Sequence, residues 1–318
     1  MFKFLNQRYI KKYSTIYLYV TETLMPELMT TRELADYLRI KERKIYELAR
    51  DGKIPCARVT GKLLFPKHQV DLWLARATEG PVRAPRTPPP PIIAGSHDFL
   101  LDWALRESGS DLAMLTCGSM AGLERLAAGR ALAAGLHLVD AATGDYNLAA
   151  VSSTLAGHDV VLIEWAWRRQ GLVLASGNPH GVTGLADLAS GGLRVVQRQD
   201  GSGSQLLFRK LLDDAGLCLD DLKLAGDVPK SELDLGLSVL EGRADGGLAI
   251  EAVARQLSLD FIPLARERYD LAVARPDYFE PPFQQLLAFA AGDNFRRHAD
   301  EAGGYDTDGL GRVVWNAA

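Results

Sequence analysis

A proline-rich stretch divides this chain and limits what it can fold into. Residues 80–91 read Gly-Pro-Val-Arg-Ala-Pro-Arg-Thr-Pro-Pro-Pro-Pro, with six prolines in twelve positions. Proline lacks the backbone N–H that helices and central strands use, so the stretch predicts a stiff, extended linker. We therefore expect an N-terminal arm over residues 1–28, a small domain over residues 29–79 and a larger domain over residues 92–318.

Charge is distributed unevenly across this boundary. Residues 1–91 carry 17 Lys and Arg against 9 Asp and Glu, whereas residues 92–318 carry 19 against 31. Without the arm, residues 30–80 are still positive, with 11 basic against 7 acidic side chains. A basic head on an acidic body indicates that only the head meets a polyanion such as double-stranded DNA.

Cysteine usage and hydropathy favour a cytoplasmic protein without a membrane span. Cys56, Cys117 and Cys218 are far apart and show no metal-ligand spacing, which is typical of reduced thiols. No apolar run reaches the roughly 18 residues that a membrane helix needs. The apolar run at residues 16–20 is too short for a signal peptide, so we expect an appended arm or a translation start at Met25 or Met29.

The small domain reads as a helix-turn-helix. Thr30 and Glu33 form a predicted capping box at the start of a short helix. After a tight turn, residues 41–51 predict a second helix that buries Ile45, Leu48 and Ala49, with Gly52 suited to a left-handed C-terminal cap. A hairpin that turns at residues 60–61 would form a wing, and a third helix over residues 67–75 would pack beneath it with Val70, Trp73 and Leu74.

The second helix would normally enter the major groove of DNA. Its basic side chains and its tyrosine lie off the predicted buried face, and two further basic residues lie on the predicted wing. Arginine and lysine suit guanine edges and phosphates, and a tyrosine hydroxyl suits a phosphate. A solvated basic face on a generic helical domain would read the same way. The predicted DNA-binding residues are Lys41, Arg43, Lys44, Tyr46, Arg58 and Lys62.

The string from Met29 to Leu74 resembles the excisionase/MerR-type winged helix-turn-helix family. The matching segments are Thr31-Arg32-Glu33-Leu34-Ala35, Tyr46-Glu47-Leu48, Asp51-Gly52-Lys53-Ile54-Pro55, Phe65-Pro66 and Val70-Asp71-Leu72-Trp73-Leu74. The resemblance covers about 45 residues and implies DNA binding. The Ser or Thr that usually caps the recognition helix is replaced by Ile40-Lys41, so the start of that helix is expected to fray.

The larger domain alternates short apolar runs with amphipathic stretches. Residues 160–163 and 193–196 predict strands, and residues 205–215 and 233–241 predict helices, which indicates an α/β fold with a mostly parallel sheet. Three segments place Ser and Gly where a strand passes into a helix, and free N–H groups at such a start suit an anion. These segments are residues 95–98, 118–122 and 198–204.

From residue 92 onwards the chain resembles the type II periplasmic-binding-protein-like domains that include the molybdate- and tungstate-binding proteins. The matching residues are Gly95-Ser96-His97, Gly118-Ser119 with Gly122-Leu123, His137-Leu138-Val139-Asp140, Thr143-Gly144-Asp145-Tyr146-Asn147, Arg198-Gln199-Asp200-Gly201-Ser202-Gly203, Gly242-Arg243-Ala244-Asp245-Gly246-Gly247, Phe261-Ile262-Pro263-Leu264 and Glu267-Arg268-Tyr269-Asp270-Leu271. The resemblance implies two α/β lobes joined by crossover strands, with a ligand bound between them.

We predict that one cavity between these lobes binds a small anion, an oxyanion such as molybdate first and a small carboxylate second. Arg198 would add charge to the hydroxyl and backbone donors. Taken singly, each residue has a plainer interpretation: Arg198 as a surface ion pair, His97 as a local hydrogen-bonding group and Asp245 as a helix cap. The predicted ligand-binding residues are Ser96, His97, Ser119, Tyr146, Asn147, Arg198, Ser202, Gly203, Ser204 and Asp245.

The leading interpretation is a ligand-responsive, homodimeric transcription regulator that is not an enzyme and needs no cofactor, metal or membrane. Two half-sites usually require two heads, and Trp73 with its apolar neighbours is a candidate dimer contact. Two alternatives stay open. One is an enzyme or cofactor-insertion factor that uses the two-lobed body, and the other is a transporter's solute-binding protein, which the helix-turn-helix head disfavours.

Overall fold

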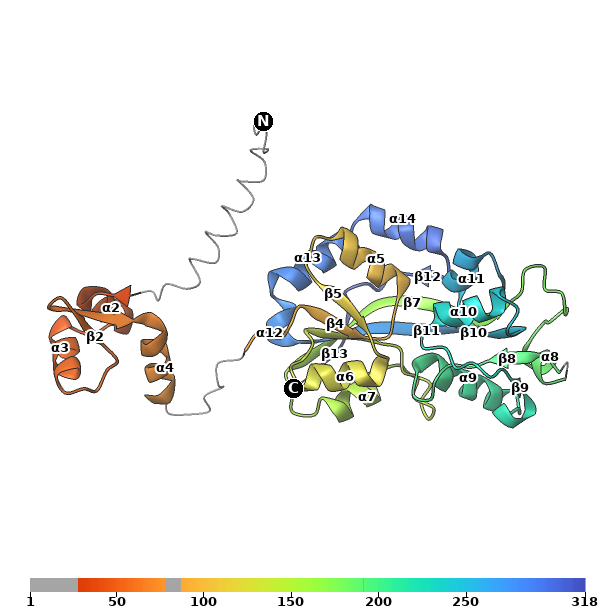
Figure 1. The fold of residues 1–318 in the computed structure, drawn as a ribbon, viewed down its shortest axis with the longest axis horizontal. Helices are drawn as coiled ribbons and strands as arrows, with labels where there is room; N and C mark the ends of the chain where they lie inside the picture. Colours follow the sequence, from red (N-terminus) through yellow and green to blue (C-terminus); the bar gives the residue numbers. More distant parts are fainter. Residues whose placement is uncertain (1–27, 78–86, 191, 318) are drawn as a thin grey trace, which may run out of the picture. The chain divides into compact units, whose positions relative to one another are not determined.

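The computed structural model describes residues 28–77, 87–190 and 192–317. The chain divides into two compact units, residues 1–87 and 88–318, which are described separately below. The predicted arm over residues 1–28, except its last residue, and residues 80–86 of the predicted linker over residues 80–91 lie outside the described residues. Figure 1 labels the helices and strands.

The N-terminal unit has the predicted winged helix-turn-helix architecture. Strand β3 pairs antiparallel with both β1 and β2, and the β2–β3 hairpin forms the wing. The elements of this unit are β1 (Leu28–Met29), α2 (Thr31–Leu38), α3 (Glu42–Arg50), β2 (Ala57–Val59), β3 (Lys62–Pro66) and α4 (Lys67–Ala77).

Local sequence signals account for the ends of these elements. The Thr30 hydroxyl accepts a hydrogen bond from the Glu33 N–H at 3.3 Å, and the Glu33 carboxylate accepts one from the Thr30 N–H at 2.8 Å, so the capping box is confirmed. Gly52 has a φ of +64° after α3, as predicted. The hairpin turns at Thr60 and Gly61, whose φ values of +49° and +78° suit a two-residue turn.

One apolar core holds the N-terminal unit together. Ile45 and Ala49 are the buried residues of α3, and Val70 is buried on α4 with Trp73 and Leu74 packed against the core. The predicted inward faces of both helices are therefore confirmed. The core residues are Met29, Leu34, Ala35, Ile45, Ala49, Ile54, Phe65 and Val70.

The C-terminal unit is built on one long mixed sheet with the strand order β5-β4-β6-β11-β7-β10-β8-β9. Strands β12 and β13 pair with β7 off this path. The strands are β4 (Ile92–Gly95), β5 (Ala113–Thr116), β6 (Ala133–Leu136), β7 (Val160–Leu174), β8 (Arg194–Val196), β9 (Lys223–Leu224), β10 (Gly246–Ile250), β11 (Asp260–Ala274), β12 (Tyr305–Asp306) and β13 (Val313–Asn316).

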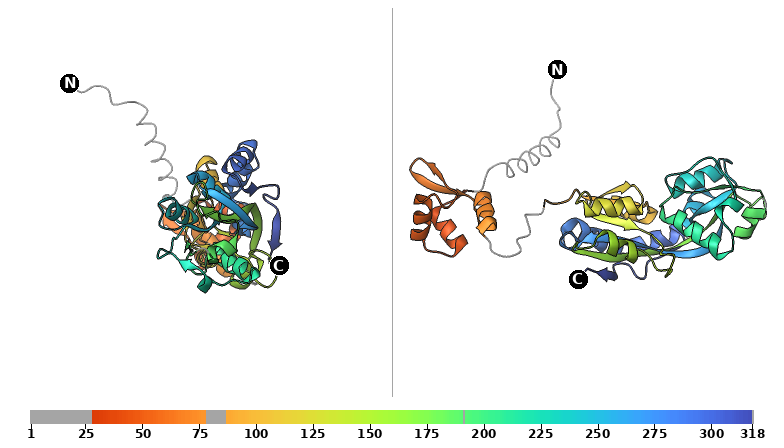
Figure 2. Two further views of the ribbon diagram at one scale, coloured as in Figure 1. Left: turned by 90° about the vertical axis from the view of Figure 1, so that its right-hand side faces the viewer. Right: turned by 90° about the horizontal axis from the view of Figure 1, so that it is seen from below.

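Two 15-residue strands, β7 and β11, run antiparallel through the middle of this sheet. β11 pairs with β6 on one side, and β7 pairs with β10 on the other, so the two strands link two lobes. The first lobe comprises β4 to β6 and its helices, and the second lobe comprises β8 to β10 and its helices. Figure 2 shows the two lobes side by side, the first yellow and blue and the second green to teal. The predicted two-lobed α/β fold is confirmed.

Helices pack on both faces of the sheet in each lobe. In the first lobe, α5, α13 and α14 share one apolar core with the strands, and α6 and α7 share another. In the second lobe, α8 and α9 cover one face, and α10 and α11 cover the other. The helices are α5 (Phe99–Glu107), α6 (Ser119–Ala127), α7 (Leu148–Thr154), α8 (Leu185–Ser190), α9 (Gly203–Asp214), α10 (Glu232–Leu240), α11 (Glu251–Leu257), α12 (Arg275–Tyr278), α13 (Pro281–Ala290) and α14 (Asp293–Ala302).

A helix that crosses a membrane must be long and apolar enough to span the hydrocarbon layer. Among the described residues, no helix is both long enough and apolar enough to span a bilayer.

Candidate functional site

A pocket in the C-terminal unit is lined by residues from both lobes, and we call it the cleft pocket. Its first-lobe residues lie at or just after the carboxyl ends of β4, β5 and β6, where parallel strands pass into helices or loops. Its second-lobe residues precede α9 and α10, or open α10. Ligands of open α/β sheets commonly bind at this edge. The lining residues are Ser96, His97, Thr116, Gly118, His137, Arg198, Lys230, Ser231 and Glu232.

The first-lobe wall offers hydroxyl groups and a helix start. The Ser96 and Ser119 hydroxyls lie 2.8 Å apart, and Ser119 is fully buried, so Ser119 supports the wall from behind. The Ser119 hydroxyl also accepts a hydrogen bond from the His137 N–H at 3.3 Å. Gly118 caps α6 with a φ of +88°, which a side chain would strain, and it provides no side-chain hydrogen bond to the helix. The first N–H groups of α6 thus begin at the pocket wall.

The second-lobe wall contains the predicted arginine. Arg198 donates from Nε to the Pro229 carbonyl at 3.1 Å and from Nη2 to the Lys230 carbonyl at 2.7 Å. Burial lowers the pKa of Arg198, while Glu232 and Asp234 oppose that shift. Arg198 lies among backbone carbonyls and not beside a carboxylate. It therefore does not form the surface ion pair of the plainer interpretation. The guanidinium keeps its positive charge because the intrinsic arginine pKa is so high.

The start of α9 lies directly against the first lobe. Ser202 caps α9 by accepting a hydrogen bond from the Gln205 N–H at 3.3 Å. A Cβ atom on Gly203 would lie 2.6 Å from the His137 carbonyl oxygen, so only glycine fits here without a shift. Ser204 is buried, and its hydroxyl has no hydrogen-bond partner among the described residues.

Three predicted ligand-binding residues lie elsewhere, and their assignment to the pocket is corrected. The Tyr146 hydroxyl donates a hydrogen bond to the Arg266 carbonyl at 3.0 Å. Asn147 donates from Nδ2 to Asp270 at 2.8 Å and accepts from the Leu138 N–H at 2.6 Å. Asp245 binds Arg194 at 2.8 Å and directly precedes β10, so it is neither a pocket residue nor the helix cap of the plainer interpretation. Each side chain is held by a partner that the sequence alone did not identify.

A buried network of charges lies behind the pocket, and the sequence analysis missed it. Arg168 projects from the middle of β7 and is 1% exposed, with Nη1 3.0 Å from the Asp98 carboxylate and Nη2 bonded to Glu267 of β11. The His137 Nδ1 lies 2.8 Å from Glu267 Oε2. Asp98 also caps α5 and accepts a hydrogen bond from the Tyr305 hydroxyl at 2.8 Å.

These charges fix one another's protonation states. Burial alone would lower the pKa of Arg168, but the adjacent Glu267 and Asp98 carboxylates outweigh burial and raise it. Burial alone would likewise raise the pKa of Glu267, but Arg168 and His137 outweigh burial and hold that pKa below its usual value. The network therefore carries charge at neutral pH in the middle of the two connecting strands.

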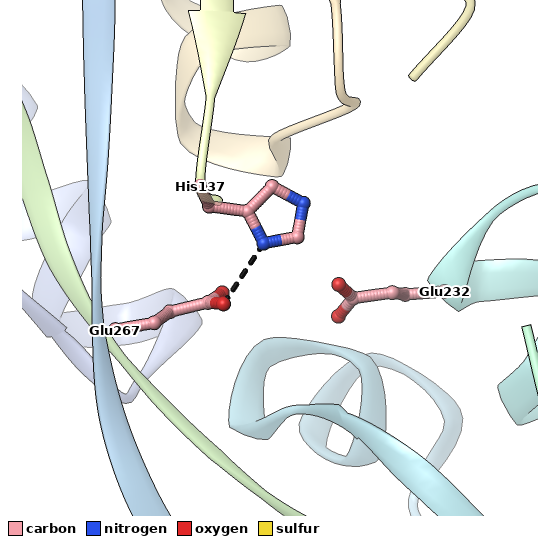
Figure 3. A group of neighbouring side chains, drawn as sticks. All are labelled: His137, Glu232 and Glu267. Carbon is pink, nitrogen blue, oxygen red and sulfur yellow. Dashed lines mark hydrogen bonds and ion pairs between the residues drawn. The ribbon is translucent and has the colours of Figure 1, made fainter. Parts of the chain in front are cut away.

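His137, Glu232 and Glu267 also form a group with metal-ligand chemistry. One nitrogen of His137 and one oxygen from each glutamate all lie within 4.8 Å of one another. Figure 3 shows both carboxylates directed towards the same edge of the imidazole ring. His137 belongs to the first lobe, Glu232 is the first residue of α10 in the second lobe, and Glu267 lies on β11.

The predicted DNA-binding residues lie on the surface of the N-terminal unit. Arg43 and Lys44 are 90% and 59% exposed, and both approach Glu47 one turn along α3, at 3.4 and 3.2 Å. Such exposed intrahelical pairs are weak, so phosphates can compete for both cations. Within the described residues, the Lys41 side chain makes no capping hydrogen bond to α3. Lys41, Tyr46, Arg58 and Lys62 are exposed as well.

Comparison with known proteins identifies both units. The family model of the PBP superfamily domain matches residues 103–291, which is more than half of the chain. The model of a helix-turn-helix domain matches residues 28–78. A structure from Clostridium perfringens with bound phosphate, described as the substrate-binding protein of a phosphate ABC transporter, has a TM-score of 0.50 at 12% identity. The match covers 68% of this chain and 98% of that one, and it supports the fold alone.

Two relatives match at the level of sequence. Protein YvgK of Bacillus subtilis (strain 168) is 26% identical over 300 residues, which is 90% of this chain and 97% of that protein. A Clostridium pasteurianum protein from the 5′ region of a 2Fe-2S ferredoxin gene is 34% identical over 85 residues. That match covers 26% of this chain and 75% of the relative. The similarity to YvgK thus extends across both units of this chain.

Proposed function

Because the chain belongs to the PBP superfamily and carries a helix-turn-helix domain as well, we infer that it is a DNA-binding regulator with a ligand-binding domain. We propose further that a small anion is the effector, and that this protein works in the cytoplasm, where it controls transcription. The observation that carries this proposal is the cleft pocket, in which Ser96, the start of α6 and Arg198 face one space from two lobes.

The polar groups of the pocket support an anionic effector. Hydroxyls, helix-start N–H groups and a guanidinium are hydrogen-bond donors that match oxyanions and carboxylates. Phosphate is bound by the Clostridium perfringens protein of the same fold, which supports an oxyanion as the first class to test. The net negative charge of residues 92–318 does not oppose this strongly, because distant surface charges are screened beyond about 8 Å at physiological salt.

A thermal-shift screen of the full chain tests the anion proposal. Molybdate, tungstate, phosphate and small carboxylates would be added singly at up to millimolar concentration. An anion present at 100 times its dissociation constant should stabilise the C-terminal unit by about 2.7 kcal/mol. Arg198→Ala should abolish that shift, whereas Arg194→Ala, which removes an arginine paired with Asp245 outside the pocket, should preserve it. An equal shift in both variants would contradict the assignment of the anion to this pocket.

Two substitutions in the N-terminal unit separate sequence readout from general affinity for DNA. Arg43→Ala on α3 should relax sequence preference by about 1–3 kcal/mol at one base position, because arginine would contact a base edge. Lys62→Ala on the wing should weaken binding to all duplexes alike and reduce the salt slope by about one. Fluorescence anisotropy over a range of salt concentrations measures both effects. If Arg43→Ala weakens specific and random duplexes equally, α3 is not the reading helix.

We also propose that the regulator is a homodimer. Helix-turn-helix heads of this size usually bind two half-sites, and two chains supply the two heads. Leu72 on α4 is 46% exposed beside the partly buried Trp73, which supports α4 as a contact. Sedimentation that shows a monomer with and without DNA would contradict the dimer. The alternative, that the protein is an enzyme, has less support. The pocket groups described above suit binding, and they include no evident nucleophile with a general base beside it.

A further inference from the structure

The cleft pocket has two chemically opposed sides. Ser96, Thr116 and Arg198 offer donors that suit an anion, but Glu232 lines the same pocket, and a carboxylate repels an anion. Glu267 lies just behind it, within the same 4.8 Å group as His137. We propose that His137, Glu232 and Glu267 bind a divalent first-row transition-metal ion that joins the two lobes. A cation at this position would separate the carboxylates from the anion.

The ligand types define the class of metal. One imidazole nitrogen with two carboxylate oxygens suits Zn²⁺, Mn²⁺ and their neighbours better than Ca²⁺, which prefers an all-oxygen shell, or Cu⁺, which prefers sulfur. Three protein ligands leave at least one coordination position open. An anion that enters the pocket would reach that position, a step that rests on the anionic effector proposed above.

The charge of the surroundings favours a cation. Within the described part of the chain, Arg168 is the one guanidinium in contact with the two fully buried carboxylates of Asp98 and Glu267, and Glu232 adds a third carboxylate. Arg198 and Lys230 also line the pocket, but Arg198 donates to backbone carbonyls and Lys230 is exposed to solvent. With Arg168 and Arg198 counted against the carboxylates of Asp98, Glu232 and Glu267, the buried side of the pocket keeps one net negative charge when His137 is neutral, as a metal ligand must be. A divalent ion would compensate it.

Gln170 provides a second and independent indication of a cation beside Glu232 and Glu267. This side chain is fully buried on β7, and its Nε2 donates to Glu267 at 2.9 Å and to Glu232 at 3.3 Å. Its Oε1 is a buried acceptor without a hydrogen-bond partner in the part of the chain that the structure describes. Rotation of the amide by a half-turn would direct Oε1 towards both carboxylates. That orientation is unfavourable beside two bare carboxylates and favourable beside a cation.

Gly203 packs closely against the ring of His137. A Cβ atom on Gly203 would lie 2.7 Å from Cε1 and 2.8 Å from Nδ1 of His137, so a side chain would collide with the ring at that edge. Nδ1 is also the nitrogen that faces Glu267 at 2.8 Å. Ligand bonds of about 2.0–2.2 Å would draw the three residues closer together. The metal would therefore hold the second lobe, through Glu232, against the first lobe, through His137.

Titration of the chelator-treated full chain with ZnCl₂ and, separately, MnCl₂ in an isothermal calorimeter tests this inference. We expect one ion per chain, and Glu232→Gln should weaken that binding at least about 10-fold, because it removes one ligand charge. Glu232→Gln keeps an acceptor oxygen for the Ile250 N–H, so the variant should fold. The matched control is Glu241→Gln at the exposed end of α10, which should bind as the unmodified chain does.

His137→Gln is the second variant and should weaken metal binding to a similar degree. The inference is overturned if neither ion binds, or if binding survives unchanged in both Glu232→Gln and His137→Gln. Its failure is distinguishable from that of the proposed function. An anion that shifts the melting temperature of a chain that binds neither metal ion would contradict the metal site alone. Metal binding without any anion effect or DNA binding would contradict the regulator alone.

Discussion

Replacing Arg168 by methionine should lower the free energy of unfolding of the C-terminal unit by about 3–5 kcal/mol. Arg168 bridges Asp98 and Glu267 in the middle of the sheet, and all three side chains are at most 1% exposed. Methionine fills much of the space but leaves two buried carboxylates without their cation. Urea denaturation followed by tryptophan fluorescence measures this, because the C-terminal unit holds four of the five tryptophans.

Arg169→Met is the matched control for this experiment. Arg169 is the next residue on β7, but its side chain is 50% exposed and pairs with Glu251 at 2.7 Å. Arg255 also pairs with Glu251, so the loss should cost about 1 kcal/mol or less. Equal destabilisation by the two substitutions would mean that the Arg168 network does not hold the sheet together as described.

Replacing Gly203 by alanine should weaken anion binding by about 10- to 100-fold while leaving each lobe folded. The added methyl group would meet the His137 carbonyl oxygen at 2.6 Å, a contact between the second lobe and the first. The lobes would have to move apart to relieve it, and overpacking of this kind costs about 1–3 kcal/mol. Calorimetric titration with molybdate and with phosphate, together with circular dichroism of the variant, measures affinity and folding separately.

Gly226→Ala supplies the comparison. Gly226 also belongs to the second lobe, but a Cβ atom there would meet nothing within 4 Å. This substitution should change neither affinity nor folding. If Gly203→Ala bound the anion as tightly as Gly226→Ala, the contact between the lobes would not be part of the bound state.

The N-terminal unit was predictable because its signals are local. Thr30 and Glu33 are three residues apart, and the Thr60-Gly61 turn determines the hairpin by its backbone conformation. The spacing of Ile45 and Ala49 gave the buried face of α3 correctly. In such cases the partner of each residue lies within one helical turn or one hairpin, where period and capping preferences apply.

The cleft was predictable only in part. Ser96, His97 and Arg198 line the pocket as the strand-to-helix pattern indicated, since parallel strands end at one edge of a sheet. Ser119, Ser202 and Gly203 support it from the helix starts. Tyr146 and Asn147 are held by residues of β11 more than a hundred positions away, and no local pattern reveals such partners.

The buried network had a weak signal in the sequence. Arg168 and Gln170 stand with Glu164 and Arg169 in an otherwise apolar strand, and charged residues between Glu267 and Asp270 interrupt another. A charged residue inside a buried strand requires a partner, but the sequence does not say which one. Asp98 lies 70 positions from Arg168 and Glu267 lies 99 positions away. The antiparallel pairing of β7 and β11 places Glu267 opposite Arg168, and Asp98 reaches the guanidinium from the start of α5.

The proposed regulation depends on one coupling, by which an anion in the cleft pocket changes the affinity of this chain for DNA. It is tested most directly by fluorescence anisotropy of the full chain on labelled duplexes from the region upstream of its own gene, with and without the anion that gives the largest thermal shift. We expect the dissociation constant for one duplex to change by about 5- to 150-fold when the anion is present. The Arg198→Ala variant should bind the same duplex without responding to the anion. An unchanged dissociation constant at an anion concentration that saturates the cleft would contradict the account.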